Sequence, residues 1–279
     1  MRELSTDRII ETVAELAKKA NYNLSEDIIT KFKNAKKREK SPIAKEIFSQ
    51  LIENAEIAAR EKMPICQDTG FAVVFLEIGS ELNIKGNIYE AVNKGIKKGY
   101  TEGFLRKSIV KDPIIRENTN DNTPAVIYTD IVPGDKLKIT LAPKGGGSEN
   151  MSQLKMLKPT DGIEGIKKFV LKTVEDAGAN PCPPIIVGVG IGGTFEKAAY
   201  LSKKALLRPL DDYHSEEHIA DLEKDLLKEI NELGIGPQGM GGTNTALAVK
   251  IEKYPCHIAS LPVAVNLNCH ASRHKEIII

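Results

Sequence analysis

Long hydrophobic runs are missing from this sequence of 279 residues. No stretch approaches the roughly 20 consecutive apolar residues that a membrane-spanning helix needs. The segment from Met1 to Asp7 is mostly polar or charged, and it lacks the apolar core of a secretory signal peptide. We therefore expect a cytoplasmic protein that does not bind a membrane, in a compartment where cysteine thiols stay reduced.

Net charge is almost absent as well, because 39 lysines and arginines are balanced by 38 aspartates and glutamates, leaving a formal charge of +1. Both signs are mixed along the chain, so no overall field would attract nucleic acid. With 41% hydrophobic residues, the chain can form a substantial core. The composition predicts a globular protein of enzyme size, and we expect a single domain, 1–279, whose binding function depends on a local site.

Cysteine pairs of the Cys-x-x-Cys type, typical of structural zinc sites, are also missing. The four cysteines are far apart in the sequence, and each lies among glycine, proline or polar residues: Cys66, Cys182, Cys256 and Cys269. Single thiolates from separate loops are typical of an iron–sulfur cluster assembled by tertiary folding. Inert cysteines are the main alternative, and spacing does not identify which cysteines would bind.

The periodicity of apolar residues changes along the chain. Helical spacing between Asp7 and about Glu61 predicts an N-terminal helical layer, residues 1–62, and short β-branched and aromatic runs then alternate with helical ones over residues 63–279. The predicted fold class is α/β, with mixed sheets flanked by helices. Strands are expected at 71–78, 125–130, 136–141 and 185–188 and in two apolar runs ending at Asn268, and helices at 88–99, 163–176, 195–207 and 216–233.

Two features bear on how the strands pair. Pro133 and Gly134 lie between the strands predicted at 125–130 and 136–141, and this pair is typical of a tight turn, so we expect a β-hairpin. The sequence ends in three isoleucines, 277–279, which predict either an apolar edge strand that contacts another chain or a segment packed into its own core.

Gly188, Gly190 and Gly193 fit the Gly-x-Gly-x-x-Gly fingerprint of dinucleotide-binding loops, with Asp211 and Asp212 near the expected position of the acidic ribose ligand. A nicotinamide-dependent dehydrogenase is therefore an alternative. It requires a strand that carries the acid, whereas the residues around Asp211 predict a loop between two helices. Without that strand, the glycines predict either a tight turn without a ligand or an anion-binding helix start.

A second glycine run, Gly145 to Gly147, follows Lys144. Consecutive glycines can form a backbone nest that binds an anion, or they can simply mark a loop between secondary-structure elements. The neighbouring lysine favours an anion. The run is not a P-loop, because no Gly-Lys-Ser/Thr sequence closes it.

Four motifs around these features resemble the iron–sulfur hydro-lyase family of class I fumarate hydratases and tartrate dehydratases. They are Pro64–Gly70 (PICQDTG), Lys144–Asn150 (KGGGSEN), Asn180–Pro184 (NPCPP) with Gly188–Thr194 (GVGIGGT), and Asn268–His274 (NCHASRH). The resemblance covers essentially the whole chain, and the motifs occur in the family's order. The chain resembles the α subunit of the two-subunit enzymes, equivalent to the N-terminal part of the single-chain ones.

The resemblance implies a 4Fe-4S cluster held by Cys66, Cys182 and Cys269, with Cys256 as a spare thiol. Three thiolates leave one iron open, and that iron acts as a Lewis acid on a substrate hydroxyl and carboxylate. Asp68 and His257 are the expected proton-transfer residues, and Arg273 and His274 are expected as supporting or surface charges. The substrate-binding positions implied by the resemblance are Gln67, Asp68, Arg106, Lys144, Gly146, Gly147 and His257.

The implied activity is the reversible hydration of fumarate to L-malate, a dicarboxylate reaction, by an α subunit that works with a β subunit in an α2β2 heterotetramer. The closest alternative is dehydration of L-tartrate to oxaloacetate. A non-enzymatic iron–sulfur or scaffold protein is a third interpretation. Since the family places further cations and an acid or base on the β subunit, the α chain alone is expected to bind the cluster and be nearly inactive.

Overall fold

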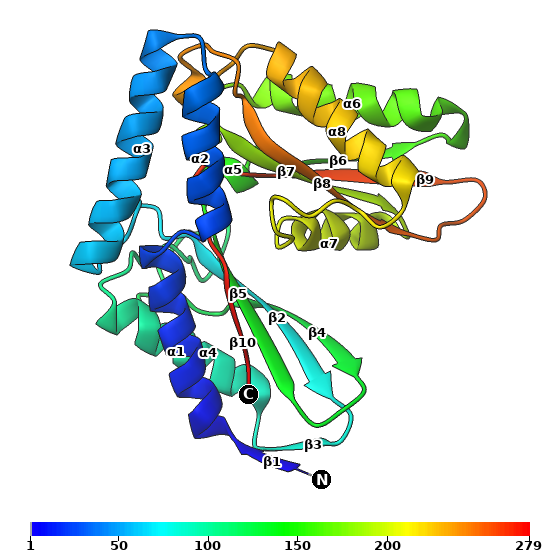
Figure 1. Cartoon of the computed structure of the whole chain (residues 1–279). Coiled ribbons are helices and arrows are strands. Elements are labelled where there is room, and N and C mark those ends of the chain that lie inside the picture. Colours follow the sequence, from blue (N-terminus) through cyan, green and yellow to red (C-terminus); the bar gives the residue numbers. More distant parts are fainter. Residues whose placement is uncertain (1) are drawn as a thin grey trace. The chain divides into compact units, whose positions relative to one another are not determined.

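A computed structural model of the chain describes residues 2–279, which form an α/β fold, so the predicted class is confirmed (Figure 1). The residues form two compact units. Unit 1 combines the described residues up to Leu24 with Asn54–Gly146 and Arg273–Ile279, and unit 2 combines Ser25–Glu53 with Gly147–Ser272. Each unit has its own hydrophobic core.

Three helices at the start of the chain confirm the predicted helical layer: α1 (Thr6–Tyr22), α2 (Glu26–Arg38) and α3 (Pro42–Glu61). Capping serines account for the first residues of α1 and α3. The Ser5 side chain accepts a hydrogen bond from the N–H of Arg8, and the Ser41 hydroxyl accepts one from the N–H of Ala44 at 3.3 Å. Helix α3 contributes residues to both units.

The main sheet of unit 1 has the strand order β10-β5-β2-β4. Helices α1 and α4 (Ile88–Glu102) supply apolar residues to the core that covers this sheet, which includes Val13, Val74 and Ile96. A short parallel pair, β1 with β3, lies apart from it. The strands of unit 1 are β1 (Arg2–Ser5), β2 (Phe71–Gly79), β3 (Leu82–Lys85), β4 (Val126–Val132), β5 (Leu137–Lys144) and β10 (Lys275–Ile278).

The predicted hairpin between β4 and β5 is wrong, because β2 lies between them, parallel to β4 and antiparallel to β5. The segment with Pro133 and Gly134 crosses the end of β2, where the N–H of Gly79 donates to the Lys136 carbonyl at 2.8 Å. A Cβ atom at Gly79 would lie 2.4 Å from the Gly134 carbonyl oxygen. The turn signal was correct, but it marks a crossover and not a hairpin.

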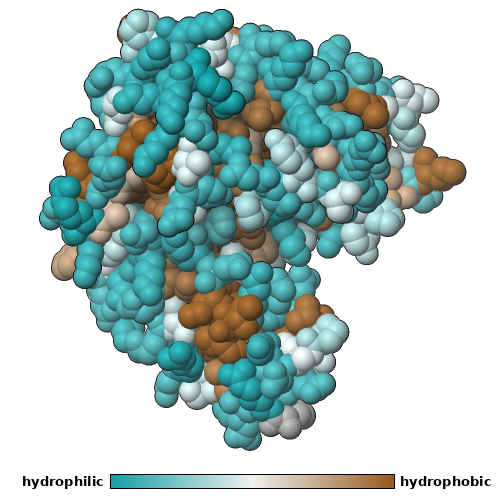
Figure 2. All heavy atoms as spheres, viewed as in Figure 1, coloured by the Kyte–Doolittle hydropathy of each residue, from teal (hydrophilic) through white to brown (hydrophobic). Residues whose placement is uncertain are grey.

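Strand β10 lies at the edge of this sheet, antiparallel to β5. Ile279 packs against the core of unit 1 and exchanges two backbone hydrogen bonds with Leu137, whereas Ile277 and Ile278 are 38% and 58% exposed. Figure 2 shows a brown, apolar area over the part of unit 1 where Figure 1 places β10 and β5. Packing into the chain's own core is therefore confirmed for Ile279, and Ile277 and Ile278 lie in an exposed edge strand whose contact with another chain stays a prediction.

Unit 2 contains a four-stranded sheet in the order β6-β9-β7-β8. Figure 1 shows α6 and α8 on one face of this sheet and α7 on the other. The strands are β6 (Gln153–Leu157), β7 (Ile185–Gly192), β8 (Ala246–Tyr254) and β9 (Leu261–Asn268). The helices are α5 (Gly146–Glu149), α6 (Gly162–Ala177), α7 (Phe195–Ala205) and α8 (Glu217–Glu232), and single 3₁₀ turns lie at Pro159–Asp161 and Pro237–Gly239.

None of the helices formed by residues 2–279 combines the length and the apolar character that crossing a bilayer requires.

Candidate active site

The Cys66 loop, residues 64–70, connects α3 to β2 in unit 1. Its organising residue is Asp68, whose two carboxylate oxygens accept separate backbone hydrogen bonds. Oδ1 accepts from the N–H of Gly70 at 2.9 Å, and Oδ2 accepts from the N–H of Gly146 at 2.8 Å. The first bond forms an Asx turn, and the second ties the Cys66 loop to the glycine run after Lys144. The Gly146 N–H, a predicted substrate donor, is therefore bonded to Asp68 in this structure.

Thr69 attaches Arg106 to the same loop. The Thr69 hydroxyl accepts a hydrogen bond from the Arg106 N–H at 2.9 Å and donates to the Arg106 carbonyl at 3.2 Å. The Tyr100 hydroxyl donates to the Thr69 carbonyl at 2.8 Å, and burial raises the pKa of Tyr100, so this donor stays protonated. Two predicted site residues, Gln67 and Arg106, thus present exposed side chains from adjoining backbone segments.

Lys144 ends β5 and is only 3% exposed. Its backbone lies directly against Gly70, where an added Cβ would come within 2.5 Å of the Lys144 carbonyl oxygen. Gly70 also has a φ of +65°, which glycine adopts without a steric penalty. This close approach brings the predicted anion-binding lysine to the base of the Cys66 loop.

Arg273 is the least expected member of this region. It was predicted as a supporting or a surface charge, and the structure shows it 4% exposed, with Nη2 donating to the Asp68 carbonyl. Its other guanidinium donors, Nε and Nη1, have no hydrogen-bond partner among residues 2–279. A buried cation with unused donors is costly, so the arrangement suits a negatively charged ligand beside the Cys66 loop.

Two of the other cysteine loops meet in unit 2. Cys182 precedes β7 and Cys269 follows β9, and these strands are antiparallel, so both cysteines lie at the same edge of the sheet. The His270 N–H donates to the Cys182 carbonyl at 3.3 Å. Cys182 is exposed and has a φ of +54°, an uncommon conformation for a residue with a side chain. Its backbone is therefore held in place by its surroundings.

The loop 255–260, which carries Cys256 and His257, lies at the opposite edge of that sheet, beyond the ends of β8 and β7. Strand β7 has eight residues, so about 20 Å separates the two edges. The Cys256 thiol donates to the Ser260 carbonyl at 3.3 Å, and His257 Nδ1 accepts from the Ala259 N–H at 3.2 Å. Within unit 2, the structure does not bring His257 to Cys182 and Cys269.

The glycines of the dinucleotide fingerprint have a packing role. Gly188 and Gly190 lie inside β7 and not in a loop, facing α7. A Cβ at Gly188 would lie 2.1 Å from the Ser202 carbonyl oxygen, and one at Gly190 would lie 2.1 Å from that of Ala198. Close helix-to-strand packing therefore explains these glycines without a nucleotide.

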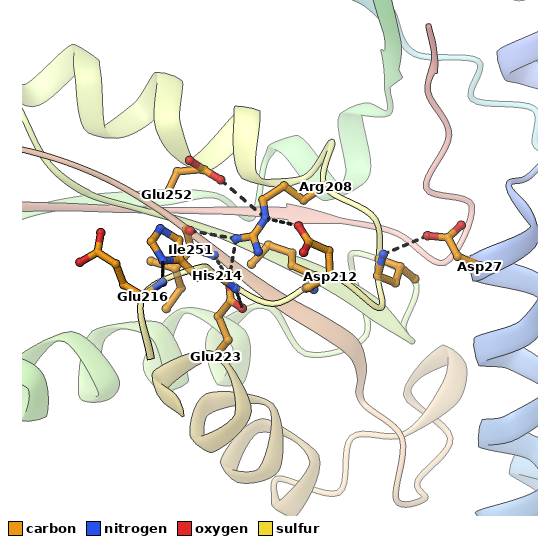
Figure 3. A network of polar contacts seen from close by, with 10 residues as sticks. Asp27, Arg208, Asp212, His214, Glu216, Glu223, Ile251 and Glu252 are labelled. Carbon is orange, nitrogen blue, oxygen red and sulfur yellow. Dashed lines mark hydrogen bonds and ion pairs between the residues drawn. The ribbon is translucent and has the colours of Figure 1, made fainter. Parts of the chain in front are cut away.

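The two aspartates of that fingerprint also have structural partners. As predicted, no strand separates α7 from α8. Asp211 forms an ion pair with Lys31 at 2.6 Å, and Asp212 accepts from Arg208 at 3.3 Å. Figure 3 shows Arg208 between Asp212, Glu223 and Glu252, and its Nη1 donates to Glu223 at 2.8 Å. This network fastens the α7–α8 loop to β8.

No group of three or more His, Cys, Asp or Glu side chains within residues 2–279 is arranged to hold a metal ion. The donor chemistry nonetheless fits an iron–sulfur group. Cys66, Cys182 and Cys269 are reduced thiols on polar loops, two of them at one sheet edge, and Arg273 offers buried positive charge beside the third. Cys66 belongs to unit 1, and Cys182 and Cys269 belong to unit 2.

The fold and the site define an α/β protein with thiol-bearing loops and a buried arginine beside one of them. The model of the family described as "Fumarate hydratase (Fumerase)" matches residues 10–278. The chain is 48% identical over 273 residues to the "Putative L(+)-tartrate dehydratase subunit alpha" of Methanocaldococcus jannaschii, with 95% of each chain covered. It is 33% identical over 282 residues to the "L(+)-tartrate dehydratase subunit alpha" of Escherichia coli O157:H7, covering 100% of this chain and 93% of the relative.

The chain therefore belongs to the class I fumarate hydratase family, a family of hydro-lyases that includes the tartrate dehydratase α subunits. This confirms the resemblance carried by the four motifs.

Several residues that shape the site were not assigned from the sequence. Thr69 lies inside the Pro64–Gly70 motif, but nothing in the sequence beyond its position between Asp68 and Gly70 pointed to a role for it. Tyr100 had no signal and lies one residue beyond the helix predicted at 88–99, although α4 extends to Glu102. Gln238 stands in a glycine cluster that indicated only a loop.

Proposed function

We propose that this chain is the α subunit of an iron–sulfur hydro-lyase that acts on a four-carbon dicarboxylate, with L(+)-tartrate as the favoured substrate. The observation that carries the proposal is the contact between Arg273 and Asp68. It places a buried, incompletely paired guanidinium against the backbone of the Cys66 loop. Such a site suits a bound anion better than a purely structural role.

Cys66, Cys182 and Cys269 would hold the 4Fe-4S cluster, and Cys256 would not take part. When bound, such a cluster with one open iron supplies Lewis-acid activation of a substrate hydroxyl, which makes hydroxide a better leaving group. The position of Cys256 at the far edge of the unit 2 sheet supports its exclusion.

The residues of the chain would bind and orient the diacid. The Arg106 guanidinium has the planar fork that matches a carboxylate, and Thr69 fixes its backbone beside Gln67. Lys144 and Arg273 add positive charge at the base of the loop. Dehydration breaks one C–H and one C–O bond and releases water, so a base must take the proton as negative charge develops next to a carboxylate.

Asp68 suits positioning better than proton transfer, because both of its carboxylate oxygens already accept backbone hydrogen bonds. His257 remains a predicted functional residue, and its distance from Cys182 within unit 2 means that its role requires a separate test.

The choice between substrates depends on the relatives. The sequence motifs favoured fumarate hydration, with tartrate dehydration as the alternative. Relatives at 48% and 33% identity carry the tartrate name, which supports the alternative. From tartrate, loss of water gives an enol that tautomerises to oxaloacetate. Fumarate stays the second candidate, because the family model carries that name.

A β subunit is the proposed partner, in an α2β2 assembly. The relatives are named as α subunits, which supports a second chain, and the exposed apolar edge strand β10 supports a protein contact.

Iron and sulfide analysis of anaerobically prepared protein tests the cluster assignment. Serine substitutions at Cys66, Cys182 and Cys269 should each abolish iron binding, whereas Cys256→Ser should load like wild type. Equal loading of all four variants would refute the assignment. Bound NAD in a wild-type chain that takes up no iron would instead support the dehydrogenase alternative.

Turnover tests the reaction. The α and β chains together should dehydrate L-tartrate faster than L-malate, and the α chain alone should be nearly inactive. Faster hydration of fumarate would restore the fumarase assignment. Full activity after Arg106→Ala would remove the proposed substrate clamp, and inactivity of the loaded complex towards all three acids would favour a non-enzymatic protein.

A further inference from the structure

Gln238 lies in the glycine-rich segment that joins α8 to β8, in the single 3₁₀ turn Pro237–Gly239. Its φ is +53°, a conformation that glycine adopts freely and side-chain-bearing residues rarely adopt. Glycines stand nearby at positions 236, 239, 241 and 242. The backbone alone would therefore favour glycine at position 238, and the glutamine side chain needs its own explanation.

That side chain reaches the residue after Cys182. The Gln238 N–H and its amide Nε2 both donate to the Pro183 carbonyl oxygen, each at 2.7 Å. A single carbonyl thus accepts two hydrogen bonds from one residue. Together these bonds fix Gln238 against the Cys182 loop.

The same amide also reaches the residue after Cys269. Gln238 Nε2 lies 3.2 Å from His270 Nδ1. The same ring nitrogen lies 3.1 Å from the Cys182 carbonyl oxygen, which can only accept. Nδ1 therefore accepts from Gln238 when the imidazole proton is on Nε2, and donates to the Cys182 carbonyl when the proton is on Nδ1. The His270 N–H in turn donates to the Cys182 carbonyl at 3.3 Å. One half-buried glutamine therefore links the residues that follow both cysteines.

We propose that Gln238 is a positioning residue that holds the Cys182 and Cys269 loops at the separation a shared metal group requires. The inference rests on the proposed function, since it assumes that these two thiols bind one group. Gln238 touches neither thiol in the contacts described, so its effect passes through Pro183 and His270. Residues that orient metal ligands in this way typically change metal affinity by about 10- to 100-fold when they are replaced.

The Gln238→Gly variant distinguishes a positioning role of Gln238 from a contribution to the stability of the fold. It removes the amide and relieves the left-handed backbone, so the metal-free chain should unfold at an equal or higher temperature than wild type. After anaerobic loading, iron should be lost to a chelator at least tenfold faster. Gln238→Met keeps the side-chain volume and should lose iron similarly. Gln50→Met is the matched control, because Gln50 lines the same surface groove and should leave iron loss unchanged.

A probe that needs no iron distinguishes failure of this inference from failure of the proposed function. In a Cys66→Ser/Cys256→Ser background, phenylarsine oxide, which bridges two nearby thiols, should bind one equivalent at Cys182 and Cys269. Adding Gln238→Gly or Gln238→Met should weaken that binding about tenfold. Unchanged arsenical binding and iron retention in both variants, or no arsenical binding with Gln238 present, would overturn the inference. Arsenical binding that depends on Gln238 in a chain that never takes up iron would overturn the cluster assignment alone.

Discussion

The carboxylate of Asp68 accepts a hydrogen bond from the N–H of Gly146 at 2.8 Å, across 78 positions of sequence. The other carboxylate oxygen accepts from Gly70, so one side chain joins two of the family motifs. An amide in its place can accept only one of these bonds and would direct its NH₂ group at the other N–H donor. Asp68 is therefore as much a structural clamp as a candidate catalytic group.

Asp68→Asn should lower the free energy of unfolding by about 1 kcal/mol, because the amide oxygen can keep the bond from the buried Gly70 N–H while the bond from the exposed Gly146 N–H is lost. Chemical denaturation of the metal-free chain measures this loss. Asp135→Asn, at an exposed position, serves as the control and should change stability by less than about 0.5 kcal/mol. An Asp68→Asn chain as stable as the control would mean that the clamp contributes little.

Replacing Arg273 should affect the stability of the chain and the binding of tartrate differently. Arg273→Met removes a buried cation whose Nε and Nη1 are unpaired among residues 2–279, so the metal-free chain should keep its unfolding temperature or gain a few degrees. The assembled enzyme should nevertheless bind tartrate at least tenfold more weakly, since a buried positive charge is lost. Thermal unfolding with and without tartrate measures both effects. A large loss of stability combined with unchanged tartrate binding would assign Arg273 a purely structural role.

Glu223 belongs to the polar network around Arg208 that includes Asp212, one of the two aspartates of the dinucleotide fingerprint. Replacing Glu223 tests how much this network stabilises the fold. The Glu223 side chain is fully buried and accepts from Arg208 Nη1 and from the Ile251 N–H, both at 2.8 Å. Glu223→Ala removes one of the three carboxylates paired with Arg208 and leaves the buried Ile251 N–H without its acceptor, so it should cost about 2–3 kcal/mol of stability. Glu216→Ala, which removes an exposed ion pair with Lys253, should cost less than about 1 kcal/mol. Similar losses for both variants would show that the network contributes no more than a surface pair.

The elements that the sequence predicted well are those set by local patterns. The first three helices carry apolar residues at helical spacing and polar start signals such as Ser41, and these agree with the structure. The hairpin prediction failed because a Pro-Gly turn specifies a change of direction but not which strand lies alongside. Here β2, almost 50 residues earlier, takes the place between β4 and β5.

The residues of the candidate site also fall into two groups, those that local sequence patterns identify and those that only contacts distant in sequence reveal. Motifs identified Cys66, Cys182, Cys269 and Lys144, because their residue types and neighbours are local features, and the family resemblance implied Arg106. The bond from Arg273 to Asp68 spans 205 positions and has no local signal, so an arginine that follows a cysteine motif was expected as a supporting or a surface charge. The contact between Gln238 and His270 was hidden for the same reason, because Gln238 stands in a glycine-rich loop and His270 lies 32 positions away.

Glu39 gives the chain a specific dependence on pH. Its carboxyl group is 2% exposed, and burial by itself would raise its pKa. Hydrogen bonds from the Asn244 amide and from backbone N–H groups, including that of Thr243 at 2.9 Å, outweigh burial and lower the pKa. The unfolded chain, with a glutamate pKa of about 4.3, therefore binds the proton more tightly than the folded chain does.

This contribution to stability is complete above about pH 5 and is lost as the pH falls through the lowered pKa of Glu39. Glu39→Gln should lower stability at pH 7 by about 2 kcal/mol and flatten its decline between about pH 5 and pH 3. Urea unfolding of the metal-free chain at several pH values measures this. Glu53→Gln, at an exposed position of α3, is the control and should keep the wild-type pH profile. Parallel profiles for wild type and Glu39→Gln would exclude this source of acid sensitivity.

His257 carries the prediction that separates cluster binding from proton transfer. It lies in the exposed loop after β8, about 20 Å along β7 from the edge that holds Cys182 and Cys269. His257→Asn should therefore leave iron and sulfide content unchanged. If His257 transfers a proton, kcat of the assembled enzyme should fall about 100-fold. Since the loop lies so far from Cys182 in its own unit, such a fall would mean that His257 serves a site formed by another copy of the chain, whereas an unchanged kcat would remove it from the catalytic residues.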